Sequence, residues 1–172
     1  PFRADAFYKD HWIAGGQYLW TYDKGFALQS SSEWVPAFNQ GTGHSTTTIA
    51  SDRDHAYAAW CGPCNPDAFA RGLSTNVGGA WHQVTLPSAF PNRYISGLAV
   101  DPADQSGRTV YVGFNGFSRR WVEGPGAGLG HLWKSVDGGV TWSDVSGTLP
   151  DVPVNDIVLR AGKIILATDL GV

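Results

Sequence analysis

The chain is poor in charge, cysteine and methionine. Charged residues make up 16% of its 172 residues, it has two cysteines and no methionine, and its net charge is −3. Lysine and arginine form no long run, so nothing supports a phosphate-binding track, and we expect no nucleic-acid partner. No apolar stretch approaches the roughly 18 residues that cross a bilayer, so we expect no membrane span.

Glycine and aromatic residues are plentiful. The chain has 22 glycines and 8 tryptophans, and aromatic residues are 13% of the total. Short runs of Val, Ile, Tyr, Phe and Trp lie between turns rich in Gly, Pro, Asp and Asn, which is the pattern of antiparallel strands. The sequence therefore predicts an all-β fold with strands near 46–50, 55–60, 70–74, 81–85, 95–100, 109–114, 130–135, 141–145, 154–159 and 163–168.

An eight-residue pattern recurs along the chain. "SVDGGVTW" at 135–142 is the clearest copy, "STNVGGAW" at 74–81 is a weaker one, and "TYDKGFAL" at 21–28 is a worn third. These copies are 53 and 61 residues apart, a spacing that fits one four-stranded sheet with its loops. The pattern residues are Ser135, Asp137, Gly139, Thr141 and Trp142, with Ser74, Asn76, Gly78 and Trp81 in the weaker copy.

The pattern resembles the repeat of the BNR or Asp-box β-propeller superfamily, Ser-x-Asp-x-Gly-x-Thr-Trp. Its flanks are similar to those of sialidases, xyloglucan-cleaving propellers, sortilin-type receptors and photosystem-assembly-type propellers. The resemblance covers nearly the whole chain and implies a β-propeller segment of four-stranded antiparallel blades. We expect about three blades in an incomplete ring within one segment, 1–172. The expected units are a partial blade at 5–35 that lacks its first strand, blades at 44–85 and 93–145, and the start of another at 152–172.

A ring usually takes about 4–8 blades. We therefore expect the remaining blades to come from a longer parent chain or from a second chain. The Asp-box residues themselves are expected to be structural. Asp137 and its glycines suit a sharp hairpin turn, and Trp142 suits packing between blades. The resemblance implies that such boxes lie opposite the active-site face.

"WCGPC" at 60–64 matches a thioredoxin active site letter for letter. A thioredoxin needs a long helix directly after the motif, and the following residues give no such helix, so little would lower a thiol pKa. A zinc site would need further ligands from scattered histidines such as His44, His55 or His82. We expect instead that Cys61 and Cys64 form a short disulfide or a pair of structural thiols. A disulfide favours an extracellular, secreted or periplasmic setting.

Propeller geometry places the loops between second and third strands, and the crossovers between blades, on one face. Ligand contacts favour loops held by a rigid scaffold. The candidate ligand-face residues on these loops are His44, Asp67, Arg93, Arg119, Arg120, Trp121 and Glu123. The alternative is that these side chains are solvated or that they cover a small core within their own loop.

Three functions remain open. The first is a segment of a secreted propeller of glycosyl-hydrolase type that acts on or binds a glycan or polysaccharide, with no cofactor or metal. Its candidate catalytic residue is Asp169, in a "TDLG" segment similar to the Thr-Asp-x-Gly-Gly of xyloglucan-type propellers; the alternative for Asp169 is a structural turn residue. The second is a non-catalytic propeller that binds a protein or polysaccharide. The third is a thiol or metal protein that uses Cys61 and Cys64.

Overall fold

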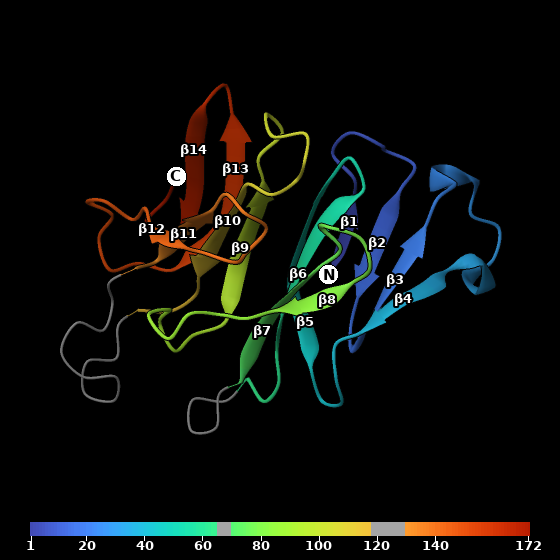
Figure 1. Ribbon diagram of the computed structural model, residues 1–172, viewed down its shortest axis with the longest axis horizontal. Helices are drawn as coiled ribbons and strands as arrows, with labels where there is room; N and C mark the ends of the chain where they lie inside the picture. The colour runs from blue at the N-terminus through green and yellow to red at the C-terminus, as the bar shows by residue number, and fades with distance from the viewer. Residues whose placement is uncertain (65–69, 118–129) are drawn as a thin grey trace.

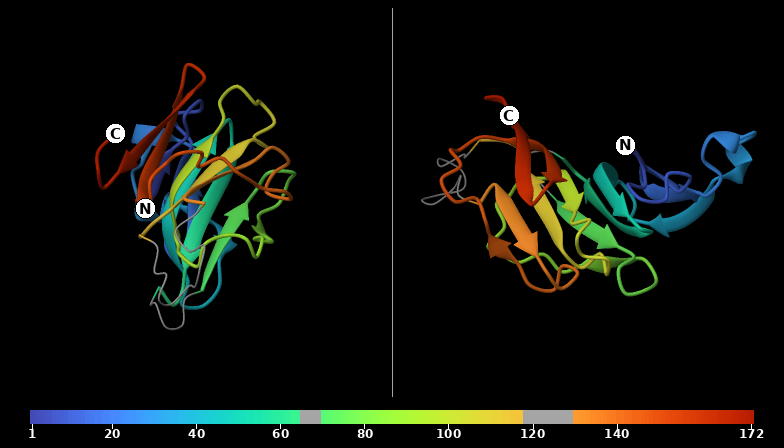
Figure 2. Two further views of the ribbon diagram at one scale, coloured as in Figure 1. Left: turned by 90° about the vertical axis from the view of Figure 1, so that its left-hand side faces the viewer. Right: turned by 90° about the horizontal axis from the view of Figure 1, so that it is seen from above.

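The chain is an all-β propeller segment. The computed structural model describes residues 1–64, 70–117 and 130–172, which form antiparallel sheets that follow one another along the chain (Figure 1). Seen from above, successive sheets stand side by side along an arc (Figure 2). The only helical segments in these ranges are two single 3-10 turns, Gly25–Ala27 and Ser31–Glu33, both between the third and fourth strands of the first sheet.

Each of the first three sheets has four strands in sequential order. The first contains β1 (Phe2–Ala4), β2 (Trp12–Gly15), β3 (Tyr18–Tyr22) and β4 (Val35–Asn39). The second contains β5 (Ser45–Asp52), β6 (His55–Cys61), β7 (Arg71–Thr75) and β8 (His82–Val84). The third contains β9 (Ile95–Val100), β10 (Val110–Phe114), β11 (Leu132–Ser135) and β12 (Ser143–Asp144). The fourth sheet has two strands, β13 (Val154–Arg160) and β14 (Lys163–Thr168).

The first sheet is complete, so the expectation that it lacks its first strand was wrong. The strand in question is β1, which pairs antiparallel with β2 and places Phe2 opposite Ala14 and Ala4 opposite Trp12. Three residues are too few to show the alternation by which a strand is recognised in a sequence. The pairing with β2 therefore defines this strand, and the sequence pattern does not.

Three apolar layers join consecutive sheets. The first and second sheets share a layer around Ile13, Leu19 and Ile49, and the second and third share the largest layer, which includes Tyr57, Leu73 and Phe114. The third and fourth share a layer around Tyr111, Leu132, Val154 and Ile157. Because each sheet buries one face against the next, the core is a series of layers between sheets.

Equivalent hydrogen bonds tie β5 to β9 and β9 to β13, which are the first strands of the second, third and fourth sheets. The Thr47 hydroxyl of β5 donates to the Ile95 carbonyl of β9 at 2.6 Å, and the Ser96 hydroxyl of β9 donates to the Val154 carbonyl of β13 at 2.6 Å. Each bond joins the first strands of two consecutive sheets. The repeated bond holds the sheets at the same relative height, so their loops gather at common ends.

Candidate functional site

The connections from one sheet to the next lie at one end of the sheets, together with the connections between second and third strands. We call this the crossover end. The β5–β6, β9–β10 and β13–β14 turns lie at the opposite end, at the top of Figure 1, and the β4–β5 turn lies at the bottom. Successive strands alternate in direction, so the chain enters and leaves a four-stranded sheet at the same end, which is the crossover end.

A cluster of two buried residues, Arg93 and His131, and the exposed Asp151 lies at the crossover end. Arg93 precedes β9, His131 precedes β11 and Asp151 precedes β13, so three separate connections meet here. The His131 ring is 2% exposed, and its Nε2 atom lies 2.9 Å from Asp151 Oδ1. Arg93 Nη1 donates to the Gly116 carbonyl at 3.0 Å and lies 3.5 Å from the same Nε2. The cluster therefore joins a cation, an imidazole and a carboxylate in one contact chain.

The geometry assigns the proton on His131. An ionised carboxylate only accepts hydrogen bonds, so Nε2 carries the hydrogen when it binds Asp151. The Arg93 guanidinium also only donates hydrogen bonds, so it has no acceptor in an Nε2 atom that carries a hydrogen. Its Nη1 atom donates instead to the Gly116 carbonyl. The Asp151 side chain is 39% exposed, in contrast to its imidazole partner. The arrangement can thus present a fixed carboxylate to a molecule at the crossover end.

Asp169 follows β14 at the same end. Its Oδ1 accepts a hydrogen bond of 2.7 Å from the Asn155 side-chain amide, near the start of β13. A groove of about 370 Å³ is bordered by Pro150 and Val152 on one side and by Thr168 and Leu170 on the other. The two carboxylates, Asp151 and Asp169, therefore belong to segments that border one groove.

His44 lies at the β4–β5 crossover and packs on a tryptophan. Its ring stacks on Trp60 with a centroid separation of 3.6 Å and an interplanar angle of 8°. Its Nδ1 atom contacts the Gln40 carbonyl at 2.5 Å, and the Trp60 indole donates to Gln83 at 3.0 Å. The structure thus uses His44 to join the first and second sheets at the crossover end.

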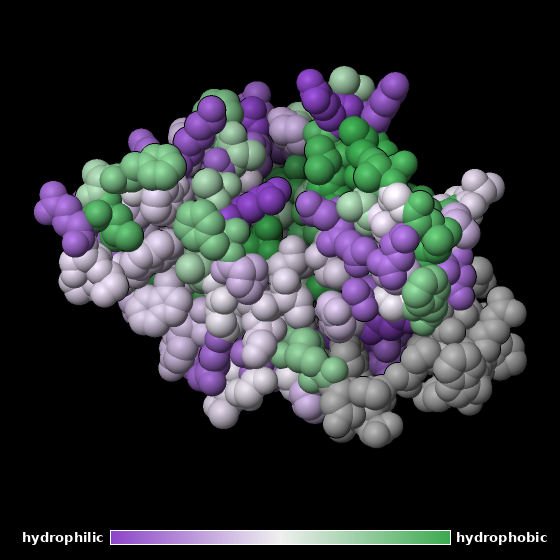
Figure 3. All heavy atoms as spheres, turned by 180° about the vertical axis from the view of Figure 1, so that it is seen from behind, coloured by the Kyte–Doolittle hydropathy of each residue, from purple (hydrophilic) through white to green (hydrophobic). Residues whose placement is uncertain are grey.

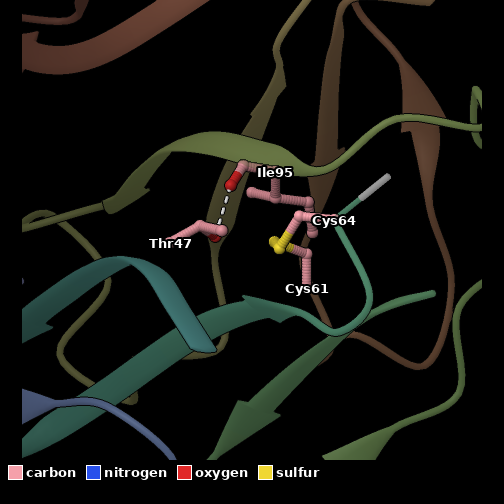
Figure 4. The surroundings of a disulfide bond; sticks show 4 residues. All are labelled: Thr47, Cys61, Cys64 and Ile95. Carbon is pink, nitrogen blue, oxygen red and sulfur yellow. Dashed lines mark hydrogen bonds between the residues drawn. A yellow bond between two sulfur atoms is a disulfide. The ribbon is translucent and has the colours of Figure 1, made fainter. Parts of the chain in front are cut away.

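Cys61 and Cys64 form a disulfide, which is one of the two arrangements that the sequence predicts for them. Cys61 is 3% exposed and Cys64 is exposed, and the bridge lies close to Thr47 and Ile95 (Figure 4). A Cβ atom at Gly62 would lie 2.2 Å from the Gly43 carbonyl, so the bridged loop packs directly against the β4–β5 crossover. The disulfide removes both thiolates as zinc ligands. Among the described residues, no three His, Cys, Asp or Glu side chains gather as metal ligands.

The remaining candidates lie outside the described residues. Asp67 belongs to segment 65–69, and Arg119, Arg120, Trp121 and Glu123 belong to segment 118–129. The buried His131 is a site residue that the sequence interpretation missed. Its partners Arg93 and Asp151 are 38 and 20 residues away along the chain, so no local motif connects them. The signal that could have indicated it is a histidine next to an apolar strand that begins at the crossover end.

The turn at 135–142 is built around Asp137, in a tight hairpin at the opposite end. Asp137 accepts hydrogen bonds from the Thr141 N–H at 2.9 Å, from the Thr141 hydroxyl and from the Ser135 hydroxyl at 2.8 Å. These bonds, those from Thr141 first, lower the pKa of Asp137 to about 2. The Gly139 N–H donates to Ser135, and the Trp142 indole donates to the Gly139 carbonyl at 2.9 Å. Every polar atom of the carboxylate thus serves the turn.

The copy at 74–81 bonds differently. Asn76 accepts from the Ala56 N–H at 2.7 Å and donates to the Asp54 carbonyl at 2.7 Å, so it holds the β5–β6 turn and not its own turn. Ser74 lies in β7 and is buried, and Gly78 has a positive φ of 91°. Trp81 packs toward the first sheet with Phe38, and Trp142 packs toward the second sheet against Phe90. Each tryptophan therefore contacts the preceding sheet.

Comparison with known proteins shows the propeller fold. The structure is similar to a GH74 xyloglucanase from Xanthomonas campestris, with a TM-score of 0.61 and 17% identity over 93% of this chain and 24% of that chain. It is also similar to YCF48 from Cyanidioschyzon merolae, with a TM-score of 0.56 and 16% identity over 96% of this chain and 46% of that chain. A GH74 enzyme from Niastella koreensis matches with a TM-score of 0.47 and 14% identity over 78% of this chain and 20% of that chain.

These matches are at the level of fold. No family model matches the chain, and no curated protein matches it in sequence. The chain spans about a quarter of the xyloglucanase and less than half of YCF48. Among the described residues, no helix is long and apolar enough to cross a membrane.

Proposed function

We propose that the chain is a segment of a secreted propeller of glycosyl-hydrolase type that acts on or binds a glycan or polysaccharide. The observation that carries this proposal is the pair of carboxylates, Asp151 and Asp169, on segments that border one groove at the crossover end. Glycoside hydrolysis commonly uses two carboxylates that flank the scissile bond. The fold is similar to that of a protein described as a GH74 xyloglucanase, so this type of fold can carry such chemistry.

Each carboxylate has a partner that orients it. The buried imidazole of His131 holds Asp151, and the amide of Asn155 holds Asp169. In the proposed reaction, one carboxylic acid protonates the leaving oxygen and the other carboxylate activates water or attacks the sugar. Asp151, the ionised carboxylate that accepts the hydrogen bond of His131, is the proposed base or nucleophile, and Asp169 is the proposed acid. Arg93, whose Nη1 atom lies 3.5 Å from His131 Nε2, supplies positive charge beside His131.

The repeat and the compartment belong to the same proposal. The Ser135, Asp137, Gly139 and Thr141 hydrogen bonds are those expected of an Asp box, so we assign 135–142 as a BNR/Asp-box hairpin. The disulfide between Cys61 and Cys64 supports an oxidising setting, because disulfides persist in secreted and periplasmic proteins.

A panel of soluble β-glucans, including xyloglucan, tests the proposal through product release and through binding. Asp169→Asn and Asp151→Asn are expected to abolish hydrolysis while binding persists. Asp54→Asn is the matched control, because Asp54 lies in the β5–β6 turn at the opposite end with its side chain 61% exposed. A chain that neither cleaves nor binds any glycan in the panel contradicts the proposal.

The second candidate is a non-catalytic scaffold that binds a polysaccharide or a protein. The likeness to YCF48 covers 96% of this chain and is nearly as strong as the likeness to the xyloglucanase. Both matches are below 20% identity and show the fold alone, so they do not decide between the candidates. Glycan binding without hydrolysis, unchanged in Asp169→Asn, would select the scaffold.

A further inference from the structure

The pair Asn115–Gly116, directly after β10, is the one Asn-Gly sequence in the chain. The main-chain nitrogen that follows an asparagine can attack the carbonyl carbon of the asparagine side chain, because the product is a five-membered ring. A following glycine favours this reaction, since it has no Cβ atom to hinder the approach and its backbone adopts many conformations. Asn115 is therefore the asparagine whose sequence context best suits a spontaneous modification.

The structure leaves both reacting groups of this pair free. The Asn115 N–H donates to the Tyr94 carbonyl at 3.2 Å, and the chain then turns at Gly116, which has a φ of 82°. In the part of the chain that the structure describes, neither the Asn115 side-chain amide nor the Gly116 N–H has a hydrogen-bond partner. No hydrogen bond of these groups therefore has to break before the side chain turns toward the Gly116 nitrogen.

Water also reaches the pair, because Asn115 and Gly116 are each partly exposed. Exposed apolar patches mark the surfaces that partners cover. Such side chains gather on the fourth sheet, over β13 and β14 at the upper right in the view from behind (Figure 3), where Val158 is 49% and Ile164 41% exposed. Asn115 follows a strand of the third sheet and is not part of that apolar surface.

Asp137–Gly138 is the one Asp-Gly sequence and could close the same ring with loss of water. Here the structure holds both reacting groups. The carboxylate accepts hydrogen bonds from the Ser135 hydroxyl at 2.8 Å and from the Thr141 N–H at 2.9 Å. The Gly138 N–H donates to the Arg108 carbonyl at 3.0 Å. Because ring closure would break these bonds, we expect Asp137 to be stable while the chain is folded.

Gly116 lies against Arg93 at the crossover end. Arg93 Nη1 donates to the Gly116 carbonyl at 3.0 Å, and a Cβ atom at position 116 would lie 3.4 Å from Arg93 Cδ. His131 Nε2 lies 3.5 Å from the same Nη1 atom. A change of covalent structure at Asn115 therefore takes place one residue from the Arg93 contact.

We propose that Asn115 is a modification site, at which the folded chain converts this asparagine to isoaspartate and aspartate. The Gly116 nitrogen gives its proton to water or hydroxide and forms a bond to the side-chain carbonyl carbon of Asn115. The bond from that carbon to its NH2 group breaks, and the group takes up a proton and leaves as ammonia. Water then opens the five-membered imide at either of its carbonyl groups.

The two openings give different products. Opening at the main-chain carbonyl gives isoaspartate, which has one more carbon in the main chain, and opening at the side-chain carbonyl gives aspartate. The net reaction consumes water, releases ammonia and involves no oxidation or reduction. Either product carries a negative charge where Asn115 had an uncharged amide, one residue from the carbonyl that Arg93 binds. This proposal does not depend on glycan activity.

Storage of the folded chain at mildly alkaline pH, followed by peptide mass spectrometry and by labelling with an isoaspartyl methyltransferase, tests the proposal. Asn155 is the internal reference, because it is exposed but its amide donates to Asp169 at 2.7 Å. We expect Asn115 to convert at least about tenfold faster than Asn155. Asn115→Gln is the matched control. It keeps the amide and Gly116 but needs a larger ring, so no isoaspartate is expected at position 115.

A parallel incubation in urea separates the effect of the structure from that of the sequence. Unfolding removes the hydrogen bonds of Asp137, so we expect isoaspartate at position 137 in urea and not in the folded chain. Asn115 is expected to convert in both states. Conversion of Asn115 only in urea, or no faster than that of Asn155 in the folded chain, would overturn the proposal. Isoaspartate at position 137 in the folded chain would equally contradict it, because the hydrogen bonds would then not determine which pair reacts.

Discussion

Gly113 of β10 and Val154 of β13 meet so closely that a Cβ atom at position 113 would lie 2.5 Å from Val154 Cγ1. The first and second sheets repeat this contact, because a Cβ at Gly15 would lie 2.6 Å from Thr46 Oγ1. At both places a glycine of a second strand therefore admits the first strand of the next sheet. This close approach sets the spacing between sheets, and through it the position of the crossover end.

Replacement of Gly113 by leucine is expected to destabilise the chain by at least about 1–3 kcal/mol, the usual cost of overpacking a core. The added side chain meets Val154 and Ile157, which are buried and have no room to retreat. Urea unfolding followed by tryptophan fluorescence measures the change. Gly16→Ala is the control, since a Cβ there meets nothing within 4 Å. Equal stability of the Gly113 variant and the parent chain would contradict the close contact.

Reduction of the Cys61–Cys64 bridge is expected to lower the free energy of unfolding by about 2 kcal/mol, the chain-entropy value for so short a loop. Unfolding in urea with and without dithiothreitol measures it. The double variant Cys61→Ser, Cys64→Ser should be insensitive to the reductant. If both thiols of the untreated protein react with iodoacetamide, the disulfide is absent in solution and the expectation fails.

Acid is expected to destabilise the chain through two turn carboxylates. Hydrogen bonds from the Ser106 hydroxyl and then the Thr109 side chain lower the pKa of Asp104 to about 2, and the Thr141 bonds do the same for Asp137. A lowered folded-state pKa stabilises the protein above the unfolded value of 3.8, and this stability is lost as pH falls toward 2. The variant Asp104→Asn, Asp137→Asn should be less stable at pH 6. Its urea midpoint should also fall less than that of the parent between pH 5 and pH 2; equal falls would refute the linkage.

Trp142→Ala is expected to cost about 3 kcal/mol, the lower end for a large aromatic side chain in a core. Trp142 is half-buried, packs against Phe90 and donates its indole N–H to Gly139. Thermal unfolding followed by circular dichroism gives the comparison. Val140→Ala, in the same turn at 78% exposure, should leave the transition unchanged. A similar loss in both variants would mean that the turn itself, and not the contact between sheets, is responsible.

The features that the sequence predicts correctly are those that depend on residues close together along the chain. The second strand of the last sheet is predicted at 163–168 and observed at Lys163–Thr168, because its apolar run is bounded by clear turn residues. The disulfide is likewise a short-range feature, because its two cysteines are only three positions apart in the sequence. The strand Phe2–Ala4 was missed because only its partner β2 defines it.

The candidate site is less accessible to such reasoning. Arg93 was a candidate from its place in a crossover, and the structure places it beside His131 and Asp151. The sequence marks His131 only as a histidine next to an apolar strand, and no local motif connects it with Arg93 or Asp151. Likewise, Asn76 occupies the pattern position of Asp137 but holds a different turn, and Ala80 stands where Thr141 supplies its hydroxyl to Asp137.

The sequence by itself determined the all-β class, the repeat, the tight hairpin at 135–142 and the cysteine pair. These depend on alternation, turn chemistry and residues close together along the chain. Only the tertiary structure decided the rest: the close contact of Gly113 with Val154, the meeting of Arg93, His131 and Asp151, and the groove bordered by the segments that carry Asp151 and Asp169. These features depend on the height and spacing of successive sheets, which are set by contacts such as that of Gly113 with Val154, between residues far apart in sequence.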